Sequence, residues 1–169
     1  MATFNLIQTV TVGAGGAASV EFTYIPQTYT DLLVLYSLRG SQAQVYTQAS
    51  LTFNASSTGY YWKMFQGTGT GTASQAVTNG SSIGGFNGTG SSATANTFGN
   101  LRLYIPNYAS SQFKSCSIND VLETNASTTY MALVAAVWTN TNAITTITMT
   151  GLNSWVQHSS ASLYGISKT

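Results

Sequence analysis

Hydrophobic and polar residues alternate along most of the chain with a period of two, which is typical of β-strands. The clearest run is 31–39, in which residues 32, 34, 36 and 38 are all large and apolar, while the opposite face begins apolar and ends with Ser37 and Arg39. Pro26, which cannot donate to a sheet, precedes the run. A helix is the alternative, but the run is short and lacks a capping glycine. The pattern therefore favours a central β-strand whose charged ends, Asp31 and Arg39, reach water.

The same alternation predicts further strands, separated by turns rich in Gly, Asn, Ser and Thr. They are residues 4–12, 20–24, 49–54, 60–65, 98–105, 113–121, 129–138, 144–149, 152–158 and 161–166. The first two flank the glycine-rich segment 13–16, which predicts an opening hairpin. The composition of 129–138 would also suit a helix, but its flanking turns favour a strand.

Residues 67–99 form a low-complexity tract of Gly, Ser, Thr, Ala and Asn. A connection of that length is uncommon inside a compact domain unless it binds something or is disordered. We expect one weak strand near 73–78 and an extended Gly/Ser/Thr-rich excursion around it. Counting about ten short strands and no convincing helix, the sequence predicts a single all-β domain over residues 1–169, a two-sheet, jelly-roll-like β-sandwich.

Charged residues make up only 5% of the chain, against about 25% in ordinary soluble domains. The net charge of +1 argues against electrostatic capture of nucleic acid or of an anionic membrane, so neither is an expected partner. A weakly charged surface resists association poorly, so we expect much of it to be covered in the working state. No apolar window is long enough to span a membrane, and the start of the chain lacks a secretory signal, which predicts synthesis in a cytoplasm.

Few residues could perform catalysis. The single histidine, His158, lies in a turn-like stretch, and Asp31, Asp120, Glu21 and Glu123 are the only carboxylates of side chains. None has a recognisable catalytic motif around it, and Asp120 and Glu123 are best explained as the polar end of a strand and its turn. The lone Cys116 cannot form a disulfide within the chain and fits a small buried residue. We therefore expect no enzymatic activity, no metal and no cofactor.

Aromatic residues are the remaining candidates for binding. Residues 60–65 hold the densest cluster, with bulky side chains on both faces, which fits either a second central strand or a strand whose outer face meets a partner. The candidate interface residues are Tyr60, Tyr61, Trp62, Met64, Phe65 and, within the low-complexity tract, Phe86. Tyr60, Tyr61 and Trp62 could also combine with Trp138 and Trp155 as a platform for sugars.

Two segments carry a resemblance to a known group of proteins. Residues 22–32 read Phe-Thr-Tyr-Ile-Pro-Gln-Thr-Tyr-Thr-Asp-Leu and lead into the first predicted central strand, which ends Ser-Leu-Arg-Gly at 37–40. The closing segment 161–166 reads Ala-Ser-Leu-Tyr-Gly-Ile. Together they resemble small virion proteins of tailed bacteriophages, particularly aquatic ones. The matching segments bracket most of the chain, whereas the middle, including 67–99, resembles these proteins only in its general character and not residue by residue.

The resemblance implies a β-sandwich without enzymatic activity that serves either as a head decoration (cement) protein or as part of a tail or fibre. We expect a capsid decoration protein on the virion surface, a homotrimer whose partner is the major capsid protein, held through residues 9–24 and 60–65. A compact domain that starts at its own Met favours decoration over a fibre module. The alternative is a tail or fibre protein that binds host glycans through surface aromatics.

Overall fold

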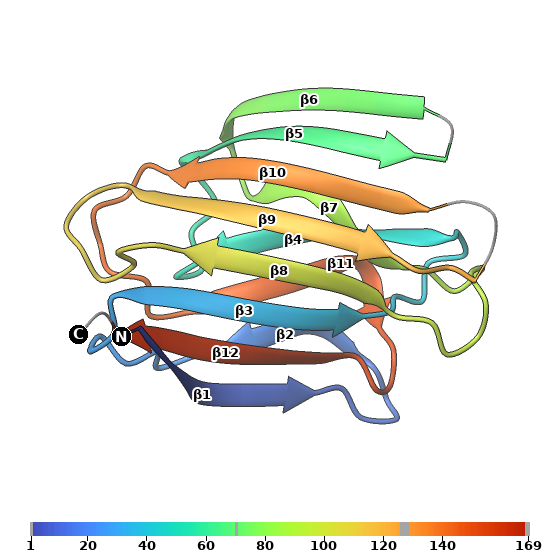
Figure 1. Cartoon of the computed structure of the whole chain (residues 1–169), viewed down its shortest axis with the longest axis horizontal. Helices are drawn as coiled ribbons and strands as arrows, with labels where there is room; N and C mark the ends of the chain where they lie inside the picture. The colour runs from blue at the N-terminus through green and yellow to red at the C-terminus, as the bar shows by residue number, and fades with distance from the viewer. Residues whose placement is uncertain (1, 70, 126–128, 168–169) are drawn as a thin grey trace.

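The computed structural model describes residues 2–69, 71–125 and 129–167, and within these ranges the chain forms twelve β-strands and no helix (Figure 1). The strands are β1 (Thr3–Thr11), β2 (Ala17–Phe22), β3 (Asp31–Leu38), β4 (Tyr46–Phe53), β5 (Tyr60–Thr68), β6 (Gly71–Gly80), β7 (Ile83–Thr89), β8 (Gly99–Ile105), β9 (Lys114–Leu122), β10 (Tyr130–Trp138), β11 (Ile147–Trp155) and β12 (Ser160–Ser167). In the part of the chain described, there is thus no helical segment that could cross a membrane.

The strands form two antiparallel sheets that pack face to face, which confirms the predicted all-β sandwich. The larger sheet has eight strands in the order β1-β12-β3-β8-β9-β10-β5-β6, and the smaller has four in the order β2-β11-β4-β7. In Figure 1 the larger sheet lies in front, with β6 at the top and β1 at the bottom. The smaller sheet lies behind it and covers its inner face.

Eight of the strands have the order of a jelly roll. Strands β1, β12, β3 and β8 are neighbours in the larger sheet, and β2, β11, β4 and β7 make up the smaller one. The remaining four strands are two inserted hairpins: β5–β6 lies between β4 and β7 in the chain, and β9–β10 lies between β8 and β11. Both hairpins extend the larger sheet, since β9 pairs with β8 and β10 pairs with β5. The extension β9-β10-β5-β6 is therefore an addition to a complete jelly roll.

The core lies between the two sheets and is rich in aromatic side chains. Trp138 at the end of β10 and Tyr60 at the start of β5 stack with ring centroids 6.1 Å apart, and the Phe53 ring of β4 lies 5.7 Å from Trp138. The Tyr60 hydroxyl accepts a hydrogen bond of 2.8 Å from the backbone N–H of Phe53, which ties the two sheets together. On β3, the even-numbered side chains from 32 to 38 are all buried, as the alternation predicts.

Three predictions about individual strands are wrong. The strand expected near 73–78 is present as part of β6, but the rest of the tract 67–99 is not one extended excursion, because it also contains β7 and the end of β5. The predicted strands 144–149 and 152–158 are replaced by the single strand β11, whose pairing with β2 shifts register between Thr150 and Trp155. The predicted opening hairpin does not form, since β1 pairs with β12 in one sheet and β2 pairs with β11 in the other.

The charged ends of the 31–39 run are buried, contrary to prediction. The Asp31 carboxylate accepts hydrogen bonds from the Tyr104 hydroxyl (2.8 Å) and the Asn107 backbone N–H (3.0 Å). Arg39 is 9% exposed, and its guanidinium donates to the backbone carbonyls of the loop that follows β7. These carbonyls belong to Ser91 (3.1 Å), Ala93 (3.0 Å), Thr94 (2.8 Å) and Thr97 (3.0 Å). Backbone groups thus bind both charged side chains inside the fold. Because the alternation of a sequence does not show which backbone groups will lie nearby, the pattern could not predict this burial.

Candidate functional site

The strongest candidate site is the outer face of the sheet extension, which points away from the smaller sheet. Five large apolar side chains there are exposed to solvent. They are Phe65 (61%), Leu133 (58%), Met131 (55%), Val121 (46%) and Tyr61 (41%). We call this surface the β9–β10–β5 face. Because successive residues of a strand point to opposite sides, the neighbours of these side chains along each strand face the core instead.

The strand register brings the exposed side chains into rows across the sheet. Phe65 of β5 lies opposite Leu133 of β10. Met131 of β10 lies opposite Val121 of β9, and Tyr61 lies opposite the half-buried Val137. Directly opposite residues of an antiparallel pair have neighbouring side chains, so the rows of Phe65 and Leu133 and of Met131 and Val121 adjoin, while the row of Lys63 and Ala135 separates them from Tyr61.

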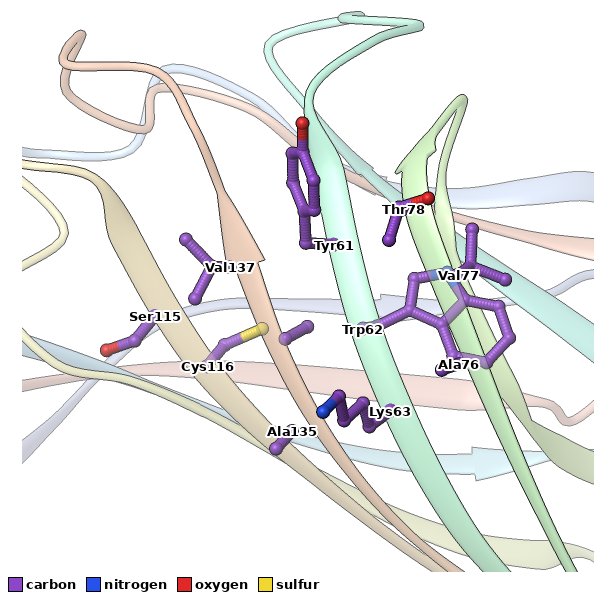
Figure 2. A pocket seen from close by; sticks show the side chains of 11 residues that line it. Tyr61, Trp62, Lys63, Ala76, Val77, Thr78, Ser115, Cys116, Ala135 and Val137 are labelled. Carbon is purple, nitrogen blue, oxygen red and sulfur yellow. The ribbon is translucent and has the colours of Figure 1, made fainter.

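Small side chains between the rows leave hollows in this surface. Figure 2 shows the first, of about 400 Å³, with Tyr61 and Lys63 of β5 on one side and Ala135 and Val137 of β10 on the other. A second hollow of about 460 Å³ lies between Ala135 and the row of Phe65 and Leu133. A third, of about 340 Å³, extends from that row to the row of Met131 and Val121. The face is therefore ridged rather than flat, which allows side chains of a partner to fit between its rows.

The β9–β10–β5 face exposes several large apolar side chains and carries little charge. Large apolar side chains offer about 150–250 Å² each when fully exposed, so these five expose roughly 450 Å² together, which is typical of a functional patch. On the outer faces of β5, β8, β9 and β10, the charged residues are Lys63 and Arg102, both basic. An apolar partner surface with a few hydrogen-bond acceptors would complement this arrangement.

Only part of the predicted interface lies on this face. Tyr61 and Phe65 are exposed there, whereas the half-buried Met64 lies on the opposite side of β5 and packs against the core. Tyr60, Trp62 and Phe86 are 0%, 8% and 1% exposed, so they belong to the core and cannot offer a surface to a partner. Trp62 and Phe86 are buried because β7 packs beneath the extension, and Tyr60 is buried against Phe53 of β4 and Trp138.

Trp62 illustrates this packing. Its ring lies against Gly84 and Gly85 of β7, where a Cβ on Gly85 would come within 2.8 Å of the ring, and its indole N–H donates to the Ser82 carbonyl (3.1 Å). Trp138 and Trp155 are also buried, at 1% and 0% exposure. Of the five aromatics considered as a sugar platform, Tyr61 is the one that is exposed, so no platform forms from them.

Sequence reasoning missed Val121, Met131 and Leu133. The run 129–138 is apolar on both faces, and that pattern predicts a strand buried on both sides. The structure leaves the face with Met131 and Leu133 uncovered. One sequence feature could have indicated this exposed face. The runs 60–65 and 129–138 both carry apolar residues on two faces, and a second layer covers only one of these faces.

The other predicted surface, residues 9–24, is divided between the two sheets. Val12, Val20 and Phe22 are buried in the core. Thr9 is exposed on β1, and Tyr24 is 93% exposed in the turn after β2, with a positive φ of 54°. Residues 9–24 therefore do not form one continuous surface, and any contact with a partner would involve separate exposed positions.

The titratable side chains are distributed over the fold. His158 is exposed in the turn before β12, as predicted. The Glu21 carboxylate accepts a hydrogen bond from the Thr148 hydroxyl (3.0 Å), and that of Glu123 accepts one from the Asn125 backbone N–H. Among the described residues, no three or more His, Cys, Asp or Glu side chains gather in a way that could hold a metal ion.

Asp120 is not the polar end of a strand but a buried group inside the sandwich, 2% exposed. Its Oδ2 accepts a 2.6 Å hydrogen bond from the Asn87 backbone N–H, which links β9 in the larger sheet to β7 in the smaller one. Burial raises the pKa of Asp120 to about 6, although the hydrogen bond from Asn87 acts in the opposite direction. Cys116 faces the core from the same strand at 6% exposure, as predicted, and burial raises the pKa of its thiol to about 12.

Comparison with known proteins gives no relative, since no protein-family model, curated protein or solved structure matches the chain.

Proposed function

We propose that this protein is a non-enzymatic structural protein of a virion, and specifically a decoration protein that binds the outer surface of a tailed-phage head through the β9–β10–β5 face. The observation that carries the proposal is the exposed ridged apolar surface formed by Tyr61, Phe65, Val121, Met131 and Leu133. An apolar patch of this size on a surface with few charges is costly to leave in water, which favours its burial against a partner. The resemblance of residues 22–40 and 161–166 to small virion proteins supplies the partner, the major capsid protein.

A repeating shell suits a binding surface of this kind. Burial of roughly 450 Å² of apolar surface contributes on the order of 10 kcal/mol before the costs of association, which consume most of it. A single copy would therefore bind modestly. Contacts between neighbouring copies raise the effective concentration of each, so that many modest contacts hold the whole layer. The resemblance implies a homotrimer on the shell.

Position on the particle is tested by counting copies. We expect quantitative mass spectrometry of purified virions to find the chain in hundreds of copies, in proportion to the major capsid protein. A handful of copies per particle would instead place it in the tail or a fibre, and absence from the particle would contradict any virion role.

The binding surface is tested by a matched pair of substitutions. Leu133 in the β9–β10–β5 face and Leu152 in β11 of the other sheet are 58% and 60% exposed, so both should tolerate Ser equally well. We expect Leu133→Ser to weaken co-sedimentation with undecorated heads about tenfold, because one large apolar contact is worth about 1–2 kcal/mol. Leu152→Ser should bind like the unmodified chain. The proposed face is wrong if both variants bind normally or if Leu152→Ser alone loses binding.

A further inference from the structure

Strand β6 forms an open edge of the larger sheet, at the top of Figure 1. It pairs with β5 on one side, in regular register from Gly71 to Val77, and no described strand lies on its other side. Apart from the half-buried Val77 and Gly80, its residues are exposed. The strand is ten residues long, and its sequence, Gly-Thr-Ala-Ser-Gln-Ala-Val-Thr-Asn-Gly, contains neither charge nor proline.

Edges of this kind are normally protected, because their free N–H and C=O groups can pair with another strand. The other three sheet edges of the described fold each show some protection. The pairing of β1 is interrupted by a register shift between Leu6 and Gln8, and β2 carries the charged Glu21. The end of β7 is partly covered, because Thr89 forms a bridge with Arg39 on the side away from β4. By contrast, β6 carries no charge, and its own register shift lies at its end, between Val77 and Gly80, so the free backbone groups of residues 71–77 are open to a partner.

We propose that β6 pairs antiparallel with β6 of a second copy across a two-fold axis, which joins the two larger sheets into one continuous sheet. An antiparallel pair of identical strands is self-complementary, so each copy supplies the same backbone groups to the other and the assembly closes as a dimer. The small Ala, Ser and Thr side chains allow close approach. The charged residue nearest to the seam along the paired strands is Lys63 of β5, which lies opposite Ala76 of β6. No like charges therefore face each other at the seam.

The two-fold axis of such a pair is perpendicular to the sheet, which places both β9–β10–β5 faces on the same side of the dimer. If that face binds a shell, as proposed above, the dimer would bind with two faces at once; this consequence rests on the proposed function, whereas the pairing does not. A single strand edge is smaller than a standard protein interface, so we expect a dissociation constant weaker than about 1 μM. A two-fold dimer also differs from the homotrimer that the resemblance implies.

Opposite charges at the seam provide the test. Ala76 is exposed near the middle of β6, so a lysine there would approach the same lysine of the second copy in any register that pairs most of the strand. We expect sedimentation of the unmodified chain to show a monomer–dimer equilibrium between about 1 μM and 1 mM, because this range brackets the expected dissociation constant. Ala76→Lys and Ala76→Glu should each be monomeric, and an equal mixture of the two should form heterodimers by native mass spectrometry. Ser117→Lys, in the same row of the sheet but on β9, should dimerise normally.

Hydrogen exchange on the unmodified chain gives a second readout that needs no variant. The β6 amides should gain at least tenfold protection as the concentration rises through the dimerisation range, while those of β1 should not. The proposal is wrong if the chain stays monomeric up to 1 mM, forms a trimer or an open series of larger species, or dimerises without protecting β6. It is equally wrong if Ala76→Lys dimerises like the unmodified chain. Leu133→Ser, which changes the β9–β10–β5 face but not β6, should dimerise like the unmodified chain, so the dimerisation result does not depend on whether that face binds a shell.

Discussion

The ring of Tyr29 lies directly against the backbone of Gly165, so closely that a Cβ on Gly165 would come within 2.3 Å of the ring carbons. Tyr29 belongs to the turn before β3, and Gly165 lies in β12, the neighbour of β3 in the sheet. The segments 22–40 and 161–166, which lie at opposite ends of the chain, therefore contact each other in the fold.

Replacement of Gly165 should destabilise this contact. Gly165→Ala would force the Tyr29 ring or the β12 backbone to move, and overpacking of this kind costs about 1–3 kcal/mol. Gly13→Ala is the control, because a Cβ there would meet no atom within 4 Å. Urea unfolding should show the loss for Gly165→Ala alone, and equal stability of the two variants would contradict the contact.

Arg39 should determine the order of the loop 91–97. Arg39→Met would leave four backbone carbonyls without their donor, and we expect a loss of about 2–4 kcal/mol in the free energy of unfolding. Arg102→Met, at an exposed arginine of β8, should change stability by less than about 0.5 kcal/mol. Limited proteolysis should cut the loop faster in Arg39→Met only. Unchanged cleavage would show that the loop holds its shape without the guanidinium.

Asp120 should make the chain less stable as the pH rises from about 4 to 6. The pKa is about 6 in the folded chain against an ordinary value of 3.8, so within this window the folded state keeps a proton that the unfolded state releases. The free energy of unfolding therefore falls with rising pH, by up to about 3 kcal/mol, and this contribution levels off above pH 6.

Denaturant unfolding between pH 4 and 7 tests this effect. Asp120→Asn keeps a side-chain oxygen for the Asn87 N–H but cannot ionise, so it should lose the slope and exceed the unmodified chain in stability above pH 6. Glu21→Gln, at an exposed carboxylate of β2, should keep the slope. If Asp120→Asn retains the full pH dependence, another group is responsible.

Strands whose alternation follows a face buried in the core were predicted over nearly their whole length, whereas the weak strand expected near 73–78 covers only part of β6. The alternation of β3, β8, β9 and β12 reflects a side-chain face that meets the core, so the predicted ranges agree with the structure. In β6 both faces are exposed, and the sequence therefore carries no apolar alternation. The β9–β10–β5 face was found only in part, because apolar residues on both sides of a strand do not reveal which side a second layer covers.

Cys116 should be unreactive in the folded chain. Its thiol is 6% exposed and has a pKa of about 12, and both properties slow alkylation, which requires an accessible thiolate. We expect iodoacetamide to modify the native protein at pH 8 at least a hundredfold more slowly than the unfolded chain. A Ser115→Cys variant carrying Cys116→Ala, with its thiol on the exposed face of β9, should react at nearly the unfolded rate. Rapid native modification of Cys116 would indicate that β9 and β10 separate readily from the layer beneath.

The outer inserted hairpin, β5–β6, joins the larger sheet through the inner one, β9–β10. Strand β10 supplies the partner for β5, whereas β9 rests on β8 of the jelly roll itself. Loss of β5–β6 would leave a sheet that ends at β10, but loss of β9–β10 would leave β5–β6 with no strand to join. Among the described strands, the hairpin at 114–138 is therefore the sole link between β5–β6 and the rest of the larger sheet, so the outermost hairpin depends on the inner one for its backbone pairing.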